Sequence, residues 1–280
     1  MLSISDLYIY PVKSLGGIRV KKALVTDRGL QHDRRFMLVD EQNKFLTQRE
    51  FPVMALLRTA IEGNELVVYH KSNIADKIKL PLTPASNGMN AIVSIWDDTC
   101  EAQYVSKEAD DWFTKQLALK CRLVYMPDTT QRKVEAAYAI SEEDITSFSD
   151  AYPLLLISQS SLDDLNNRLE EALPMNRFRP NVVIAGAQAY EEDTMEHFIV
   201  NGISFLGVKL CARCPVPTTD QESGARGKEP LRTLSKYRFV NNKVMFWQNI
   251  LCRGEGELKV GDMVEIIKRK PAMLMQQLID

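Results

Sequence analysis

Short apolar and alternating runs dominate the first hundred residues and predict a strand-rich region. The runs cover 7–12, 18–26, 34–40 and 56–62, with the turn-rich stretches "SLGG", "DRGLQHD" and "DEQNK" between them. Alternation with a period of two is typical of half-buried strands. Two hairpins are expected, one at 58–70 around Gly63-Asn64 and one at 90–106 around Asp97-Asp98.

Helical spacing replaces this alternation in two segments, 106–119 and 160–173. Ser106 can cap the first helix, and Pro174 would end the second. The predicted apolar faces consist of Trp112, Phe113 and Leu117 in the first helix and of Leu162, Leu165 and Leu169 in the second.

The remaining pattern adds further strands and one long polar stretch. Strands are expected at 121–126, 181–186, 202–210 and 261–269, whereas 127–150 is polar, weakly periodic and expected to run over the surface near a site. The sequence therefore predicts a β-dominated α+β protein, barrel-like and with a few helices. The two halves would join near 100–120, where no Gly/Ser or Pro linker marks the joint.

Composition narrows the class of protein. The chain has 280 residues, 45% of them hydrophobic and 26% charged, with a net charge of −2. These values are ordinary for a globular protein, and they argue against a nucleic-acid binder or a partner of anionic membranes. No apolar run reaches the length of a membrane span, and the start "MLSISDLYIYPVKS" does not resemble a signal peptide. Five cysteines, an odd number, favour a reducing cytoplasm with free thiols.

Two of the cysteines form the pair Cys211 and Cys214 in "LCARCPVPTTD". A structural zinc site needs four ligands, but no second C-x-x-C exists and the three histidines are scattered. Iron–sulfur spacing is missing as well. A thioredoxin-like pair should open a helix, whereas this pair closes a predicted strand and runs into two prolines.

Two interpretations of the pair remain open. The first is two thiols packed in a turn. The second is a single thiolate that binds a soft metal carried by an organic cofactor, while other residues anchor the cofactor. Such cofactors carry phosphate, so the second interpretation requires cationic side chains elsewhere in the chain.

Candidate anchors occur where strands begin or end. Lys13 and Ser14 precede the glycine turn Gly16-Gly17, whose backbone N–H groups suit an anion. Arg34 and Arg35 start a predicted strand, and by alternation only one of them can face a site. Further candidates precede the strand at 181–186, namely Arg177, Arg179 and Asn181. Each cation taken alone is more simply explained as a solvated charge at a strand end.

Together these segments resemble the MOSC family, whose proteins are built around binding of the molybdenum cofactor. The resemblance runs through "YIYPVKSLGG", "DRGLQHDRRFMLVD", "SDAYPLLLISQSSLDDLNNRL", "RFRPNVVIAG", "CARCPVPTTDQESG", "KEPLRTLSKYR" and "LKVGDMVEII". It implies an N-terminal β-barrel domain at 1–105 and a cofactor-binding MOSC domain at 106–280, packed as one unit. The chain looks most similar to the amidoxime-reducing components and their bacterial relatives. It lacks the PLP domain that accompanies MOSC domains in the cofactor sulfurases.

The resemblance also implies roles for residues. Cys214 would be the thiolate ligand of molybdenum, and Cys211 need not touch the metal. The residues implied to hold the pterin and its phosphate are Lys13, Ser14, Arg35, Arg179, Asn181 and Arg213. Asp150, Ala151 and Tyr152 match a cofactor-contacting loop, although the family often has Ser where this chain has Tyr152.

The implied activity is removal of oxygen from N-hydroxylated compounds at a Cys-ligated molybdenum centre of the molybdenum cofactor (Mo-molybdopterin). Because no flavin or nicotinamide fingerprint is present, the electron donor is expected to be a separate iron–sulfur protein or flavoprotein, or a fused domain absent from this chain. Asp220 and Glu222 are weak candidates for a proton donor. The alternative is a non-catalytic protein that binds the cofactor or carries sulfur on Cys214.

Overall fold

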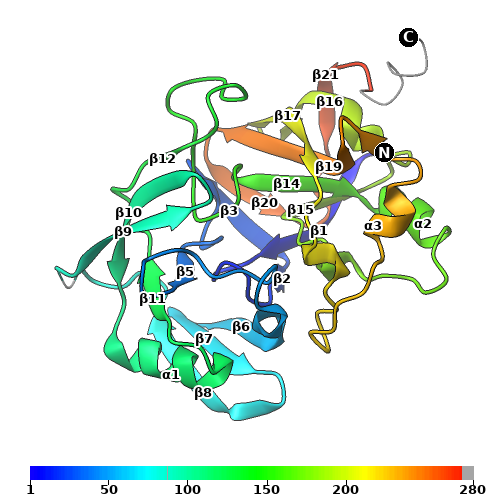
Figure 1. Ribbon diagram of the computed structural model, residues 1–280. Coiled ribbons are helices and arrows are strands. Elements are labelled where there is room, and N and C mark those ends of the chain that lie inside the picture. The colour runs from blue at the N-terminus through cyan, green and yellow to red at the C-terminus, as the bar shows by residue number, and fades with distance from the viewer. Residues whose placement is uncertain (87, 273–280) are drawn as a thin grey trace.

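The sheet that contains the first strand of the chain is built mainly from the C-terminal half. In the computed structural model, which describes residues 1–86 and 88–272, this large sheet curves as a half-barrel (Figure 1). In spatial order its strands are β2 (Ile18–Val20), β1 (Ser3–Ile9), β15 (Val182–Ala185), β14 (Leu154–Ser158), β19 (Lys243–Arg253), β17 (Ile203–Ala212), β16 (Met195–Val200) and β21 (Glu265–Arg269), with β18 (Phe239–Val240) paired to β19. β14 and β15 pair in parallel, whereas β1 pairs with β15 in the antiparallel sense.

Smaller sheets complete the strand-rich architecture, which confirms the predicted fold class. One contains β5 (Phe36–Val39), β11 (Arg122–Tyr125), β10 (Asp98–Tyr104) and β9 (Asn90–Ile95). The others contain β20 (Gly256–Lys259), β3 (Lys22–Thr26) and β4 (Gly29–Leu30); β6 (Leu57–Glu62), β7 (Glu65–His70) and β8 (Asn73–Pro81); and β12 (Arg132–Lys133) and β13 (Ile145–Thr146).

The helices are short and lie around the sheets. They are α1 (Lys107–Leu117), α2 (Gln159–Asn166) and α3 (Leu231–Leu234), together with the 3₁₀ turns η1 (Pro52–Leu56), η2 (Met175–Arg177), η3 (Glu191–Thr194) and η4 (Val216–Thr218). In Figure 1, α1 lies beside β8 at one end of the molecule, and α2 and α3 lie beside the large sheet at the other. None of the helices in the described ranges combines the length and the apolar character needed to cross a lipid bilayer.

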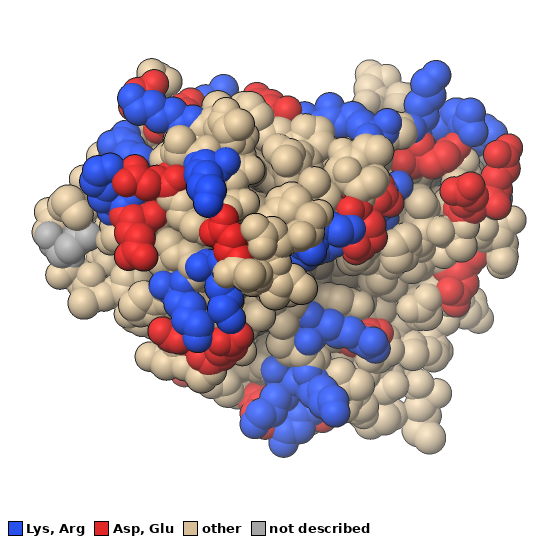
Figure 2. Space-filling view, turned by 90° about the horizontal axis from the view of Figure 1, so that it is seen from below, with Lys and Arg blue, Asp and Glu red and all other residues tan. Residues whose placement is uncertain are grey.

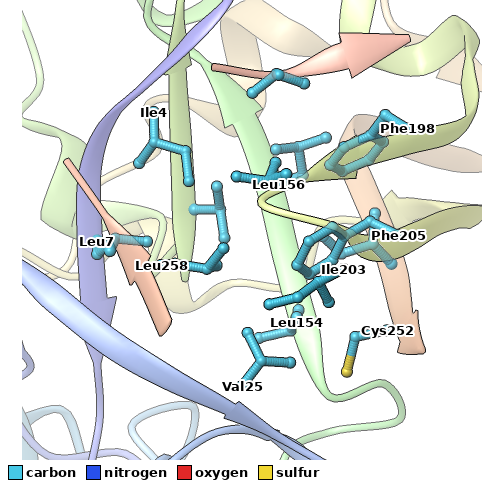
Figure 3. Packing of buried hydrophobic residues seen from close by; sticks show 14 of the residues in the cluster. Ile4, Leu7, Val25, Leu154, Leu156, Phe198, Ile203, Phe205, Cys252 and Leu258 are labelled. Atoms are coloured by element: carbon cyan, nitrogen blue, oxygen red, sulfur yellow. The ribbon is translucent and has the colours of Figure 1, made fainter. Parts of the chain in front are cut away.

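The core of the large sheet draws side chains from both ends of the sequence. Figure 3 shows Ile4 and Leu7 of β1 and Val25 of β3 beside Leu154, Phe205 and Leu258, which belong to β14, β17 and β20. All of these side chains are buried, and each contributes about 1.5 to 3 kcal/mol by leaving water. Because β1 pairs with β15 and β3 with β20, residues on both sides of the predicted boundary at 105/106 share these sheets. The boundary itself stays a prediction.

Both predicted hairpins form. The β6–β7 turn is Gly63-Asn64 as expected, because Glu62 pairs with Glu65. In the β9–β10 hairpin Ile95 pairs with Asp98, so the turn is Trp96-Asp97, one residue earlier than predicted.

Of the two predicted helices, the first begins where it was predicted and the second is shorter than predicted. α1 begins after Ser106, whose hydroxyl accepts a hydrogen bond from the N–H of Ala109 at 3.1 Å, as predicted. α2 ends at Asn166, although its pattern predicted a helix to 173. There the Asn166 side chain accepts from the N–H of Leu173 and donates to its carbonyl, and thereby closes a loop instead of extending the helix.

Two other expectations differ from the structure. The polar stretch 127–150 is not wholly on the surface, because it contains β12 and β13 and the buried residues Arg132, Asp144 and Phe148. The long strand β19 was not predicted, because buried residues on both of its faces remove the alternation that marks a half-exposed strand.

Candidate functional site

One pocket of about 270 Å³ gathers segments that lie far apart in the sequence. It is bounded by the turn after β1, the segment before β14, the segment before β15 and the end of β17. The sequence-predicted site residues that line it are Lys13, Ser14, Asp150, Ala151, Tyr152, Arg179, Asn181, Arg213 and Cys214. The structure therefore brings together almost the whole predicted set.

Arg35 is the exception, and its expected place is taken by Arg34. The guanidinium of Arg35 donates to the carbonyl oxygen of Met126 and to Asp128, away from the pocket, whereas Arg34 lines it. The resemblance implied Arg35, and the alternation rule allowed only one of the two arginines to face a site, but β5 begins only at Phe36. Arg34 instead has a φ of 50°, in the left-handed region, so the alternation rule does not apply to it.

Ser14, Arg34 and Arg179 share this unusual backbone conformation, with φ values of 67°, 50° and 61°. Non-glycine residues with positive φ are uncommon, and they concentrate at functional sites, where the surrounding structure must hold them. At Ser14 that support is visible, because the side chain of Gln48 donates to its carbonyl oxygen at 2.7 Å.

Lys13 is a buried cation held against one wall. Its Nζ donates to the carbonyl oxygen of Phe148 at 2.8 Å and to Oδ1 of Asp150 at 2.7 Å. Burial lowers the pKa of Lys13 to about 8, although Asp150 opposes that shift. The pKa of Asp150 is well below its usual range: burial favours the neutral acid, but the charges of Lys13 and Arg49 outweigh it. Asp150 is therefore a carboxylate at neutral pH.

The loop that carries Asp150 is fixed from outside the pocket by Arg132. The buried guanidinium donates to the carbonyl oxygens of Ser147, Ser149 and Asp150 at 3.0, 2.7 and 3.0 Å. Its remaining donors bind Oδ2 of Asp98. The loop is therefore preorganised, with its carbonyls already paired.

The opposite wall is built on Tyr10. The guanidinium carbons of Arg34 and Arg179 lie 4.6 and 4.3 Å from the centre of the Tyr10 ring. Asn181 orients Arg34, because its Oδ1 accepts from Nη1 of Arg34 at 3.1 Å. Arg179 donates from Nη1 to the carbonyl oxygen of Leu15 at 2.6 Å, but its buried Nη2 has no partner among the described residues. Burial lowers the pKa of Arg179 to about 10, so it stays a cation at neutral pH.

The cysteine pair lies at the end of β17. Arg213 donates from Nη1 to the sulfur of Cys211 at 3.3 Å and from Nη2 to the carbonyl oxygen of Phe178. Burial raises the pKa of Cys211 although Arg213 opposes the shift. Cys214 is half-buried and lines the pocket just before Pro215 and η4 turn the chain. The prolines were expected to exclude any helix, but they form this single 3₁₀ turn.

The other cysteines stand apart from the pocket. All five cysteines are unpaired, and burial raises the pKa values of Cys100, Cys121 and Cys252 to about 11 each. Within residues 1–86 and 88–272, no three His, Cys, Asp or Glu side chains are grouped as a metal site built by the protein alone would need.

Tyr152 is tied to the rim of the pocket. Its hydroxyl donates to Oε2 of Glu135 at 3.3 Å, and Lys209 binds the same oxygen at 3.1 Å. Glu135 belongs to the predicted excursion 127–150, so part of that stretch does border the pocket.

Sequence reasoning missed Arg49, Thr47 and Gln48, which also line the pocket. Arg49 donates to Oδ2 of Asp150 at 3.0 Å and lies 4.0 Å from the Trp96 ring centre. No local signal marks it, because "LTQRE" follows neither a clear strand nor a glycine turn.

The candidate proton donors do not reach the pocket. Asp220 pairs with Arg177 at 3.0 Å, and Glu222 pairs with Arg58 and Lys71. Neither carboxylate is among the pocket residues. The pairing with cations lowers the pKa of Glu222, which makes proton donation less favourable still.

Charges of both signs are mixed on one face of the molecule. On the face shown in Figure 2, most Lys and Arg side chains have Asp or Glu beside them, without a broad area of one sign. The cations that matter for anion binding are therefore the buried ones of the pocket.

The donor set can be tested against a phosphate-bearing cofactor with a thiolate-ligated metal. Lys13 and Arg179 supply buried positive charge and Arg34 a partly buried one, and Arg179 retains an N–H donor without a partner among the described residues. Cys214 supplies one sulfur in the same pocket. The residues present therefore fit such a group.

Comparison with known proteins gives matches over most of the chain. Residues 1–120 match the MOSC N-terminal beta barrel domain family, and residues 143–265 match the MOSC domain family. A relative from Rattus norvegicus, mitochondrial amidoxime reducing component 2, is 31% identical, and the match covers 94% of this chain and 82% of the relative. The human mitochondrial amidoxime-reducing component 1 is 29% identical, with 95% and 83% covered. A molybdenum cofactor sulfurase from Oryza sativa subsp. japonica is 29% identical over 95% of this chain but only 35% of its own length.

Proposed function

Since the chain belongs to the MOSC-domain family, together with the mitochondrial amidoxime-reducing components, we propose that it reduces small N-hydroxylated compounds with a bound molybdenum cofactor. The observation that carries the proposal is one pocket in which Cys214 lies with the buried cations Lys13 and Arg179 and the partly buried Arg34. Such a pocket joins a soft ligand for a metal to a receptor for phosphate.

Each residue has a defined task in this proposal. Lys13, Arg34 and Arg179 bind the phosphate, with Arg179 donating from its open Nη2. Cys214 is the protein ligand of the metal. Asp150 balances the charge of Lys13 and Arg49, and as a carboxylate it accepts hydrogen bonds and cannot supply the proton. When bound, the cofactor supplies the two-electron redox chemistry that removes oxygen from N–OH.

The rim of the pocket would receive the substrate. Tyr152, Glu135 and Lys209 form a hydrogen-bonded set there. In this proposal Glu135 orients the Tyr152 hydroxyl and the Lys209 ammonium at the rim, because its Oε2 accepts hydrogen bonds from both. The reductant would be a separate iron–sulfur protein or flavoprotein.

The test uses the chain produced in a host that makes the cofactor. Molybdenum per chain is measured by elemental analysis, and amidine formation from an aromatic amidoxime is followed without oxygen, with reduced viologen as the electron source. We expect turnover with viologen and none with NADH or NADPH alone. Cys214→Ser should abolish turnover, and the matched variant Cys211→Ser should keep most of it.

Two outcomes would count against the proposal. A fully loaded chain that forms no amidine with viologen would favour the alternative of a cofactor-binding or sulfur-carrier protein. Full molybdenum loading and turnover in Cys214→Ser would remove the assigned ligand.

A further inference from the structure

A second cavity, of about 300 Å³, shares Arg179 with the pocket but otherwise has its own walls. It is bounded by β1, the glycine turn after it, β6 and the segment at 174–176. The side chains that line it are Tyr8, Tyr10, Arg19, Arg58, Met175 and Asn176, together with Arg179 and Gln221. Gly16 and Gly17, which the sequence marked as an anion-binding turn, border this cavity and not the pocket.

Three buried polar atoms of the cavity lining lack hydrogen-bond partners among the residues that the structure describes. They are Oη of Tyr10, Nη2 of Arg179 and Oδ1 of Asn176. The Tyr10 side chain is 2% exposed and Arg179 is 9% exposed. Leaving a buried polar atom unpaired is costly, so the set indicates a site that is completed from outside the chain.

One edge of the Tyr10 ring faces the glycine turn. A Cβ on Gly17 would lie only 2.3 Å from Cε1 and 3.0 Å from Cζ of Tyr10. Any larger residue at 17 would therefore collide with the ring, so the glycine allows the turn to pack directly against Tyr10.

The charges of the lining have one sign. Arg19, Arg58 and Arg179 contribute guanidinium groups, and the described residues of the lining include no Asp or Glu. The carboxylates that pair with Arg19 and Arg58 are Asp6 and Glu222, which stand outside the lining. An anion would therefore meet no opposing carboxylate in the cavity itself.

The volume of the cavity and its apolar walls indicate which group the ligand carries besides the anion. Inorganic phosphate would fill only part of a cavity of about 300 Å³. Two tyrosine rings, Pro174 and Met175 supply flat apolar surface, which suits a planar ring.

From these observations we propose that the second cavity binds a small organic anion: a planar ring that carries a carboxylate or a phosphate group. The anionic group accepts from the Tyr10 hydroxyl beside the guanidinium groups of Arg19 and Arg58, and the ring packs on Tyr8 and Met175. Apart from the shared Arg179, this site is lined by other residues than the proposed cofactor site.

The test is calorimetric titration of the full chain with phenyl phosphate, benzoate, inorganic phosphate and the neutral benzyl alcohol. We expect 1:1 binding of phenyl phosphate or benzoate, and the tighter of the two identifies the anionic group. Tyr10→Phe keeps the ring and removes only the hydroxyl, so it should weaken binding about tenfold. Arg19→Gln should weaken binding about threefold.

Two variants serve as controls. Lys22→Gln removes a cation that is as exposed as Arg19 and also carboxylate-paired, but it lies outside the cavity and should leave binding unchanged. Arg49→Gln alters the first pocket and should likewise have no effect. The proposal is overturned if benzyl alcohol or inorganic phosphate binds as tightly as both ring anions, or if none of the probes binds. It is also overturned if Arg49→Gln weakens binding while Tyr10→Phe and Arg19→Gln do not.

Discussion

Two buried arginines next to the same pocket, Arg132 and Arg179, differ in how their donors are used. Arg132 makes five hydrogen bonds, three of them to carbonyl oxygens of the loop that ends at Asp150. The side chain of Arg179 makes one hydrogen bond to the described part of the chain, and its Nη2 is left without a partner. Burial and charge are similar, so the difference lies in the neighbours.

The contrast separates two roles that sequence patterns cannot distinguish. A guanidinium whose donors are filled by backbone carbonyls holds a loop in place, and it has nothing left for a ligand. A guanidinium with an open donor costs stability until a ligand arrives, which is typical of a prepared anion site. Variants of Arg132 should therefore lose stability, whereas variants of Arg179 should lose anion binding.

The largest effect is expected from Arg132→Met. The change leaves the carbonyl oxygens of Ser147, Ser149 and Asp150 without their donor, and the free energy of unfolding should fall by about 3 kcal/mol. Chemical denaturation measures the loss. Lys133→Met, an exposed neighbour with one bond to the Glu142 carbonyl, should change the stability by less than about 0.5 kcal/mol. Equal losses in the two variants would refute the structural role of Arg132.

Arg179→Met should show the opposite pattern. It removes one hydrogen bond together with an unpaired buried donor, so the free energy of unfolding should change by less than about 1 kcal/mol. Molybdenum per folded chain should fall about tenfold, because a charge-assisted contact to phosphate is lost.

Arg177→Met is the matched control for that variant. Arg177 is also buried, but it pairs with Asp220 and lies outside the pocket. Its loss should reduce stability and leave the molybdenum content of the folded fraction unchanged. Wild-type loading in Arg179→Met would show that its open donor is not a phosphate receptor.

Lys13 affects both the stability of the fold and the affinity for an anion, and a change of pH can separate these two effects. Its pKa is lowered to about 8 from 10.5, mainly by burial. Between these two values the unfolded chain binds more protons than the folded chain, so through this group the free energy of unfolding rises with pH by at most about 1.4 kcal/mol per unit. Affinity for an anion should fall over the same range, because Lys13 loses its charge above pH 8.

Denaturation and sulfate titration between pH 6.5 and 9.5 would measure both trends. Lys13→Met should remove the contribution of Lys13 to both trends. The quantity to compare is the difference between the wild type and this variant, because other groups also titrate between these pH values. If the difference between the wild type and Lys13→Met stayed constant from pH 6.5 to 9.5, Lys13 would keep its charge over the whole range.

Local patterns were enough for part of this site. Strand ends and glycine turns marked Lys13, Ser14 and Arg179 as candidates, because a residue beside a turn is placed by its own neighbours. The cysteine pair marked Cys211 and Cys214, and only the resemblance singled out Cys214. Arg49 and Tyr10 were missed, because their positions depend on Trp96, Asp150 and Gly17, which come from other segments. The strand β19 was not predicted for a related reason. Both of its faces are buried, so its sequence lacks the alternation that marks a half-exposed strand.

The smallest effect is expected from Arg35→Gln, and it tests the one position where the pocket contains the neighbour, Arg34, of the residue that the resemblance implied. Arg35 donates to the Met126 carbonyl and to an exposed Asp128, so its loss should change molybdenum per folded chain by less than about twofold. Arg34→Gln should lower that content about tenfold, because Arg34 lies on the Tyr10 ring inside the pocket. Elemental analysis measures the molybdenum content of both variants, and thermal unfolding checks that both are folded. If Arg35→Gln lost the metal and Arg34→Gln kept it, the residue implied by the resemblance would be the correct one, and the left-handed turn at Arg34 would have no functional role.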